Sequence, residues 1–137
     1  MSTQTNLEIL QSVFDSMGDA DAVVAHYTDD YVLELPYASV DGPDRTEGKA
    51  VVRERLVQAF KIFRFTLHIT EAHPCADPDL LIAEYTSEGE VIPTGRRYSN
   101  RYIGLWRFRD GKVCFTREYL NPEMARAALA PSGEEGA

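Results

Sequence analysis

Hydrophobic residues recur at helical spacing in the first half of the chain, which predicts three helices. The first covers residues 5–17, where apolar side chains stand three or four positions apart. The second runs from Asp19, a residue type that caps helices, to about Tyr27, and the third begins after Gly48. The apolar stripe of the third helix consists of Val52, Leu56 and Phe60. The pattern therefore places most helical structure before residue 63.

From Phe63 the hydrophobic period becomes two, which is typical of half-buried strands. Strands are predicted at Tyr31–Leu35, Phe63–Thr70, Leu80–Thr86, Tyr98–Phe108 and Val113–Leu120, with a loop or weak hairpin at 38–47. Pro122 begins a short helix to about Ala130, and an acidic tail at 131–137 is expected to be disordered. Helices followed by strands predict an α+β fold with an antiparallel sheet. We expect one domain over 1–137, with an ordered core at about 5–130.

Composition narrows the possible functions. The chain of 137 residues is 44% hydrophobic and has a formal net charge of −8, which argues against nucleic-acid and anionic-membrane partners. No apolar stretch is long enough for a membrane span, and no secretory signal is expected at the start. Cys75 and Cys114 form no CxxC motif, so a protein of the reducing cytoplasm is expected. No histidine pair has metal-ligand spacing, and we expect no metal site.

The hairpin around Asp110-Gly111 can have two registers, and they differ in which side chains share a face. One register has a two-residue type I′ turn, and the other has a three-residue loop with Gly111 in the left-handed region. The three-residue loop puts two arginines, which prefer water, on the outer face, and we therefore predict it, with Tyr102 opposite Glu118. The other pairs of this register are Phe108–Lys112, Trp106–Cys114 and Gly104–Thr116. The inward face then consists of Asn100, Tyr102, Gly104, Trp106, Thr116 and Glu118, which is the composition of a ligand pocket.

Two charged residues have alternative interpretations. Glu118 on an inward face would have its pKa raised by desolvation, which suits a general acid or base. In the other register it is a solvated strand residue. Arg55, at the edge of the third helix's apolar face, could reach into the pocket to hold a substrate carboxylate or to pair with Glu118. It could equally lie along the helix flank with its guanidinium in water.

Four segments together resemble the SnoaL-like branch of the nuclear transport factor 2-like superfamily. They are Gly18–Glu34, Glu47-Gly48 before a helix, Arg109–Val113 and Arg117–Pro122. The last, Arg-Glu-Tyr-Leu-Asn-Pro, is similar to the phenazine biosynthesis A/B proteins, as are Glu84–Gly89 and Asn100. The resemblance covers about residues 5–125. It implies a cone-shaped, curved antiparallel sheet wrapped around three helices of the N-terminal half, with a single deep pocket.

The resemblance also assigns individual positions. The pocket carboxylate of the phenazine proteins falls on Glu118, while their pocket histidine falls on or beside Arg55. In ketosteroid isomerases the catalytic base falls on Leu35, the oxyanion-hole acid on Gly104 and the oxyanion tyrosine near Gln11. Because these three residues lack the isomerase chemistry, ketosteroid isomerisation is not expected. The resemblance thus implies the fold more strongly than any one reaction.

Three functional hypotheses follow. The first is a cofactor-free enzyme that isomerises, cyclises, condenses or dehydrates a hydrophobic oxygenated metabolite. The second is a ligand-binding or accessory protein without catalysis, and the third is an epoxide hydrolase with an acid pair from Glu34, Glu84 and Glu118. The candidate catalytic residues are Glu118, Tyr102 and Arg55, and the candidate substrate-binding residues are Asn100, Trp106, Thr116, Leu35, Tyr37, His26, Gly104 and Leu120. A homodimer is expected through the convex sheet face, at Ile103, Leu105 and Phe115.

Overall fold

The computed structural model describes residues 4–37 and 44–131. In chain order its elements are α1 (Asn6–Asp15), α2 (Ala20–Val24), β1 (Tyr27–Glu34), β2 (Arg45–Glu47), α3 (Lys49–Ile62), β3 (Phe63–Pro74), β4 (Leu80–Val91), β5 (Arg97–Arg109), β6 (Lys112–Leu120) and α4 (Pro122–Leu129). Of the loop predicted at 38–47, residues 38–43 lie outside the described residues, as does the acidic tail from residue 132. The α+β class is confirmed.

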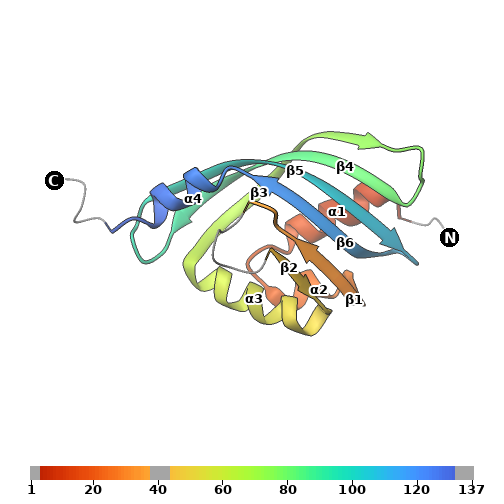
Figure 1. Ribbon diagram of the computed structural model, residues 1–137, viewed down its shortest axis with the longest axis horizontal. Coiled ribbons are helices and arrows are strands. Elements are labelled where there is room, and N and C mark those ends of the chain that lie inside the picture. The colour runs from red at the N-terminus through yellow and green to blue at the C-terminus, as the bar shows by residue number, and fades with distance from the viewer. Residues whose placement is uncertain (1–3, 38–43, 132–137) are drawn as a thin grey trace.

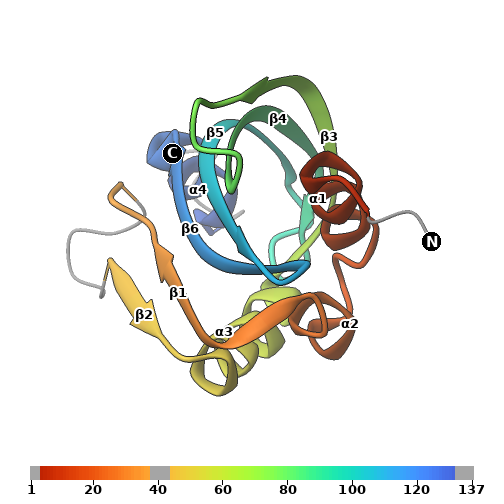
Figure 2. The same cartoon turned by 90° about the vertical axis from the view of Figure 1, so that its right-hand side faces the viewer.

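The strands form one curved sheet in the order β2-β1-β6-β5-β4-β3 (Figure 1). Seen along the sheet, the strands follow an arc, and α1, α2 and α3 lie at its open side (Figure 2). β1 pairs with β6 in parallel, whereas the other pairs are antiparallel as expected. The concave face of this sheet and the helices beside it enclose the main apolar core.

Local signals account for the first two helices. The side chain of Thr5 accepts a hydrogen bond from the Glu8 amide, and Glu8 accepts one from the Thr5 amide, which forms a capping box at α1. Asp19 caps α2 as predicted. The predicted end of the second helix at Tyr27 is wrong, because α2 stops at Val24 and Tyr27 begins β1. Tyr27 is buried there and pairs with β6.

The turn between β5 and β6 has two residues rather than the predicted three. Arg109 pairs with Lys112, and Asp110 and Gly111 between them have φ values of 53° and 78°. Positive φ at both central positions is the signature of a type I′ turn. The expected positive φ of Gly111 is therefore confirmed, but the three-residue loop is wrong.

A β-bulge next to this turn restores the predicted inward face. Phe108 pairs with Val113 and Arg107 pairs with Phe115, so Cys114 is an extra residue on β6. Without it, the two-residue turn would have turned the side chains after residue 114 to the opposite face.

The cross-strand pairs differ from the prediction while the faces agree with it. Gly104 lies opposite Glu118 and Tyr102 lies opposite Leu120, so the predicted Tyr102–Glu118 pair is wrong by two residues. A displacement of two positions keeps every side chain on the same side of a pleated sheet. The alternation along β5 confirms this, since residues 98, 100, 104, 106 and 108 are buried between more exposed neighbours.

None of the helices in the described part of the chain has both the length and the apolar character needed to cross a membrane.

Candidate functional site

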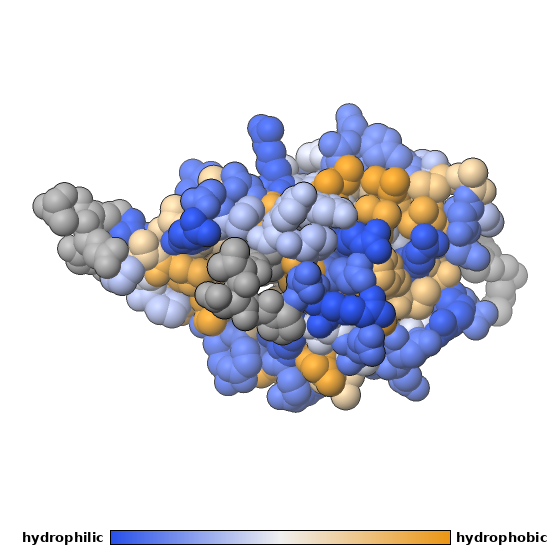
Figure 3. All heavy atoms as spheres, in the orientation of Figure 1, coloured by the Kyte–Doolittle hydropathy of each residue, from blue (hydrophilic) through white to orange (hydrophobic). Residues whose placement is uncertain are grey.

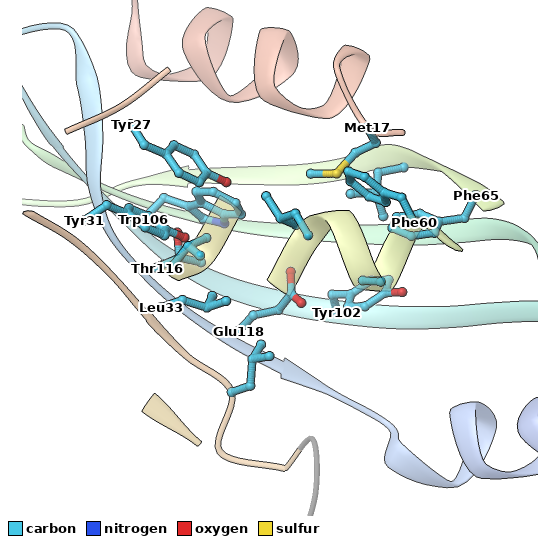
Figure 4. Close-up of a pocket in the computed structure, with 15 residues that line it drawn as sticks. Met17, Tyr27, Tyr31, Leu33, Phe60, Phe65, Tyr102, Trp106, Thr116 and Glu118 are labelled. Carbon is cyan, nitrogen blue, oxygen red and sulfur yellow. The ribbon is translucent and has the colours of Figure 1, made fainter. Parts of the chain in front are cut away.

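A cavity of about 170 Å³ opens between the concave sheet face and the helices. Figure 4 shows the side chains that point into it from the strands and from α3. Its lining consists of Met17, Tyr27, Tyr31, Leu33, Leu35, Val52, Leu56, Ala59, Phe60, Phe65, Leu67, Tyr102, Trp106, Thr116 and Glu118. Most of this surface is aromatic or aliphatic, and the few polar groups stand on β1, β5 and β6. Such a composition is typical of small-molecule sites.

Glu118 projects from β6 into the cavity (Figure 4). Burial raises the pKa of its carboxyl group to about 7, and a hydrogen bond from Tyr85 opposes that rise. The hydroxyl group of Tyr85 donates to Oε2 of Glu118 at 2.5 Å. Among the described residues, no donor contacts Oε1 of this carboxylate. Glu118 can therefore exchange a proton near neutral pH and can bind a ligand through its second oxygen.

Tyr85 is a functional candidate that the sequence analysis missed. It lies on β4, is 1% exposed, and its ring stacks on Tyr102 with centroids 5.1 Å apart. Burial, followed by the charge of Glu118, raises the pKa of Tyr85 well above its usual range, so its phenol stays protonated and can donate. Its inward position could have been predicted, because Leu81, Ala83 and Tyr85 occupy every second position of a predicted strand and therefore share one face. Its contact with Glu118 depends on two strands that are not adjacent in the sheet.

Trp106 lies beside this pair and lines the cavity as predicted. Its indole Nε1 is buried and has no hydrogen-bond partner within the described ranges. It is close enough to Tyr85 to lower the pKa of that phenol somewhat, although the two do not form a hydrogen bond of normal geometry. A Cβ on Gly104 would lie 2.6 Å from both Trp106 Nε1 and the Tyr85 hydroxyl oxygen. Gly104 thus makes room for these two side chains instead of binding substrate itself.

Two further tyrosines were also missed. Tyr27 and Tyr31 stack with ring centroids 4.0 Å apart, and the Tyr31 hydroxyl donates to Thr116 Oγ1 at 2.7 Å. Burial raises the pKa of both phenols. They were missed because the second helix was predicted to reach Tyr27, whereas Tyr27 and Tyr31 belong to the same strand and lie on one face of it.

Tyr102 lines the cavity with its ring, while its hydroxyl group bonds elsewhere. That hydroxyl donates to Ser87 Oγ at 2.8 Å and lies 3.2 Å from the Tyr98 hydroxyl. It therefore does not hydrogen-bond to Glu118. Burial raises the pKa of Tyr102, so it remains neutral.

Asn100 is buried and does not line the cavity, where it was predicted to lie. Its amide nitrogen donates to the Tyr98 hydroxyl and to the Asn121 carbonyl, and its oxygen accepts from the amides of Arg101 and Asn121. These bonds use its hydrogen-bonding groups to hold the start of α4 against β5. Asn100 is structural in this arrangement.

Arg55 does not turn into the cavity, which corrects the expectation that it holds a substrate carboxylate or pairs with Glu118. The residue is exposed, and its guanidinium donates to Thr46 Oγ1 on β2. The face of α3 toward the cavity carries Val52, Leu56 and Phe60. An arginine beside that stripe keeps its charge in water by turning to the edge strand.

The other predicted binding residues divide into two groups. Leu35 and Thr116 line the cavity. Tyr37, His26 and Leu120 do not, and their predicted placement is corrected. Tyr37 is 59% exposed and packs edge-to-face on the Tyr119 ring, while His26 is half-buried and directly precedes β1.

The acid pair of an epoxide hydrolase is not assembled within the described ranges. Glu34 accepts hydrogen bonds from Arg45 and Arg117, and Glu84 hydrogen-bonds with His73 on the outer face of the sheet. Neither lines the cavity, which leaves Glu118 as its lone carboxylate among the described residues.

One cluster on the outer face has the donor types of a metal site. Glu71, His73 and Glu84 each place one ligand atom within 4.8 Å of the others. The sequence predicted no metal site because no histidine pair has metal-ligand spacing, whereas this cluster has one histidine and a member on the neighbouring strand. Glu84 hydrogen-bonds to His73 and, together with Glu71, raises the pKa of its imidazole. They are solvent-accessible and lie away from the cavity.

Comparison with known proteins identifies the family. Residues 12–115 match the model of the SnoaL-like domain. An uncharacterized PhzA/B-like protein of Pseudomonas aeruginosa is 33% identical over 114 residues, which is 82% of this chain and 79% of that relative. This agrees with the similarity of the Arg117–Pro122 segment to phenazine biosynthesis proteins.

Solved structures share the fold. The crystal structure of a proposed isomerase from Bacillus subtilis is 31% identical, with a TM-score of 0.83 and coverage of 90% of this chain and 91% of that one. A Mycobacterium tuberculosis protein in complex with an estradiol hemisuccinate is 25% identical, with a TM-score of 0.76 and coverage of 88% and 98%. Proteins named NTF2-like have the same architecture. The cone-shaped fold expected from the resemblance is thereby confirmed.

Proposed function

Since this chain belongs to the SnoaL-like family, we propose that it is an enzyme in which Glu118 transfers a proton on a small hydrophobic, oxygenated molecule. The reaction would be an isomerisation, cyclisation, condensation or dehydration that needs no bound cofactor. The observation that carries the proposal is the buried carboxyl group of Glu118, which faces an apolar cavity and has a pKa of about 7. A base with a pKa near the working pH is both sufficiently ionised and sufficiently basic.

The chemistry would follow from the position of this carboxylate. Glu118 would take a proton from a carbon beside a carbonyl group, which leaves an enolate, and would return the proton to another atom of the same molecule. Tyr85 would hold the carboxylate at a fixed orientation through its 2.5 Å hydrogen bond. The apolar walls formed by Leu33, Val52 and Phe60 would limit water around the reacting atoms.

The relatives support a small-molecule role in this cavity. The Bacillus subtilis structure is described as a proposed isomerase, and the Mycobacterium tuberculosis protein binds an organic ester. The PhzA/B-like relative is the reason to place the reaction in secondary metabolism. We further propose that the chain forms a single SnoaL-like domain. We also propose that it acts in the cytoplasm, since the free thiols of Cys75 and Cys114 are compatible with a reducing compartment.

We also propose that the protein forms a homodimer through the convex sheet face. Ile103 is 41% exposed there, with Leu105 beside it on β5 and Phe115 on β6. Figure 3 shows hydrophobic residues gathered over β5 and β6 on this face. A second copy would remove this apolar surface from water.

A non-catalytic ligand-binding protein is the second candidate. It is favoured by the hydroxyl groups of Tyr31 and Tyr102, which are hydrogen-bonded to Thr116 and Ser87 rather than directed at a ligand. Glu118 would then recognise a ligand without reacting with it.

Deuterium exchange can separate these candidates without knowledge of the natural substrate. Single-ring ketones, cyclohexanone among them, are incubated with the protein in D₂O, and loss of their α-proton signals is followed by NMR. Wild type should accelerate exchange, and Glu118→Gln should lower that rate by roughly 10²–10⁴-fold. Glu88→Gln makes the same chemical change on an exposed residue outside the cavity and should leave the rate unchanged. If wild type gives only the buffer rate, while ligands still bind, the binding protein replaces the enzyme as the proposed function.

A further inference from the structure

The cavity sets an upper size for the part of a ligand that enters it. Its volume is about 170 Å³. An apolar protein cavity of about 150 Å³ holds one benzene molecule, so this space fits one six-membered ring with a small substituent. The rings of Tyr27, Phe60 and Trp106 provide apolar walls for it (Figure 4).

The charges around the cavity disfavour an anionic ligand. Glu118 is the one side chain of the described lining that can be charged near neutral pH, since the tyrosines there have raised pKa values. Arg55 faces Thr46 outside the cavity, and Arg117 pairs with Glu34 at 2.6 Å. A ligand carboxylate would therefore meet a like charge in a desolvated site whose described lining holds no cation, which costs several kcal/mol.

The hydrogen-bonding groups also disfavour an ammonium ligand. An alkylammonium has three donors, and each one that loses water without a new acceptor is penalised. Among the described residues no donor contacts Oε1 of Glu118, whereas Oε2 already accepts from Tyr85. The neighbouring oxygen of Thr116 already accepts from Tyr31. A carboxylate oxygen that accepts no hydrogen bond from the protein suits a ligand group with a single donor, as in a hydroxyl group.

We propose that the cavity takes an uncharged molecule about the size of one six-membered ring, and that a hydroxyl group of this molecule donates a hydrogen bond to Oε1 of Glu118. Phenols, enols and cyclic alcohols belong to this class. The inference rests on the proposed function in that the same carboxylate serves both, but it concerns binding alone. It replaces the expectation of an acidic substrate, which depended on Arg55.

Four cyclohexane derivatives with similar rings test this directly. Cyclohexanol offers a donor, cyclohexanone is matched in heavy atoms but has no donor, cyclohexanecarboxylate is anionic, and cyclohexylamine is cationic. Trp106 is the only tryptophan of the sequence and lines the cavity, so its fluorescence reports occupancy. Titrations are made at about pH 8.5, where a group with a pKa of about 7 is ionised.

Cyclohexanol should bind tightest, with an affinity about tenfold or more above that of cyclohexanone, because the ketone cannot donate a hydrogen bond to the charged carboxylate. The carboxylate should bind at least about tenfold more weakly than the alcohol, and the amine should also bind more weakly. Glu118→Gln should reduce the difference in affinity between alcohol and ketone and also that between alcohol and carboxylate. The amide of Gln is neutral and can both donate and accept a hydrogen bond. Glu88→Gln, an equal change in net charge outside the cavity, should keep the wild-type order.

Tightest binding of the carboxylate or of the amine, or equal affinity for alcohol and ketone, would overturn the proposal. The order of the four ligands is measured on wild-type protein, so the result does not depend on whether a variant folds. Failure here is distinct from failure of the proposed function. If cyclohexanol binds selectively but no deuterium exchange occurs, only the proposed catalysis is disproved. If exchange occurs without this selectivity, only the proposed ligand class is disproved.

Discussion

The Tyr85 hydroxyl group donates to the Glu118 carboxylate at 2.5 Å, although one strand lies between β4 and β6. The contact is possible because Gly104, on the intervening strand, lies directly opposite Glu118 and has no side chain. Tyr85 and Trp106 occupy the space where a Cβ would otherwise stand. Three strands thus combine to orient one carboxylate, and this relationship leads to the first predictions.

Replacing Tyr85 with Phe should raise the pKa of Glu118 above its present value of about 7. The lost hydrogen bond favours the charged form of the carboxylate, and its removal makes deprotonation harder. A bond of this type corresponds to a rise of about one pH unit or more. The carboxyl carbon of Glu118 can be followed by ¹³C NMR through a pH titration.

Tyr102→Phe is the matched control for that titration. Its hydroxyl bonds to Ser87 and Tyr98 instead of Glu118, so the same loss of a phenol oxygen should leave the midpoint nearly unchanged. Equal shifts in the two variants would mean that Tyr85 has no special role in setting the pKa of Glu118.

Gly104→Ala should destabilise the protein by about 1–3 kcal/mol, which is the usual effect of inserting a methyl group into a packed core. The added Cβ would lie 2.6 Å from the buried ends of Trp106 and Tyr85, so at least one ring must move. Urea denaturation measures the loss of stability, and the emission of Trp106 should change with its displacement. An unchanged midpoint with unchanged emission would show that the space above Gly104 is not needed.

Glu118 should make the folded protein less stable as the pH rises from about 4.5 to 7. In that range the unfolded chain releases the proton while the folded protein retains it, so deprotonation favours unfolding. The loss is at most about 3 kcal/mol and is complete above the folded pKa. Glu118→Gln should therefore be more stable than wild type at about pH 8.5 and similar to it near pH 4. Chemical denaturation at several pH values measures this, and Glu88→Gln should follow wild type throughout.

Ile103→Lys should convert a dimer into a monomer, because a charge on the convex face would be buried in the proposed interface. Sedimentation at micromolar concentration measures the mass of each species. Val51→Lys is the control, since Val51 is 53% exposed on α3, away from this face. A monomeric wild type would disprove the dimer itself.

Deleting Cys114 should destabilise the fold by about 4 kcal/mol or more. The deletion removes the bulge, so either the turn must rearrange or Thr116 and Glu118 must leave the concave face. Cys114→Ser retains the extra residue and should cost little. The two variants separate the effect of chain length from that of the thiol, with thermal unfolding as the measurement. Equal stability of the deletion and the Cys114→Ser variant would mean that β6 can pair in another register that keeps the same side chains on the concave face.

Several features could be read from the chain because they depend on neighbours in sequence. Alternation along residues 63–70 and 98–108 predicted half-buried strands, and Asp19 and Pro122 marked the starts of helices correctly. Short-range sterics and the two sides of a strand govern these features. The inward position of Trp106 was predicted on the same basis, whereas Thr116 and Glu118 face inward through the bulge at Cys114.

Tertiary structure decided the features that depend on distant segments. The bulge at Cys114 compensates for the tighter turn, and only pairing with β5 and β1 reveals it. Arg55 stood at the edge of a helical stripe, and in the fold its guanidinium stays exposed to water and donates to Thr46 instead of losing its hydration beside Glu118. Along an unbroken strand the sequence determined which side chains share a face, since that depends on local periodicity. Which of them meet was decided by the packing of strands that are far apart in the chain, because desolvation and hydrogen bonding act only between groups that the fold brings together.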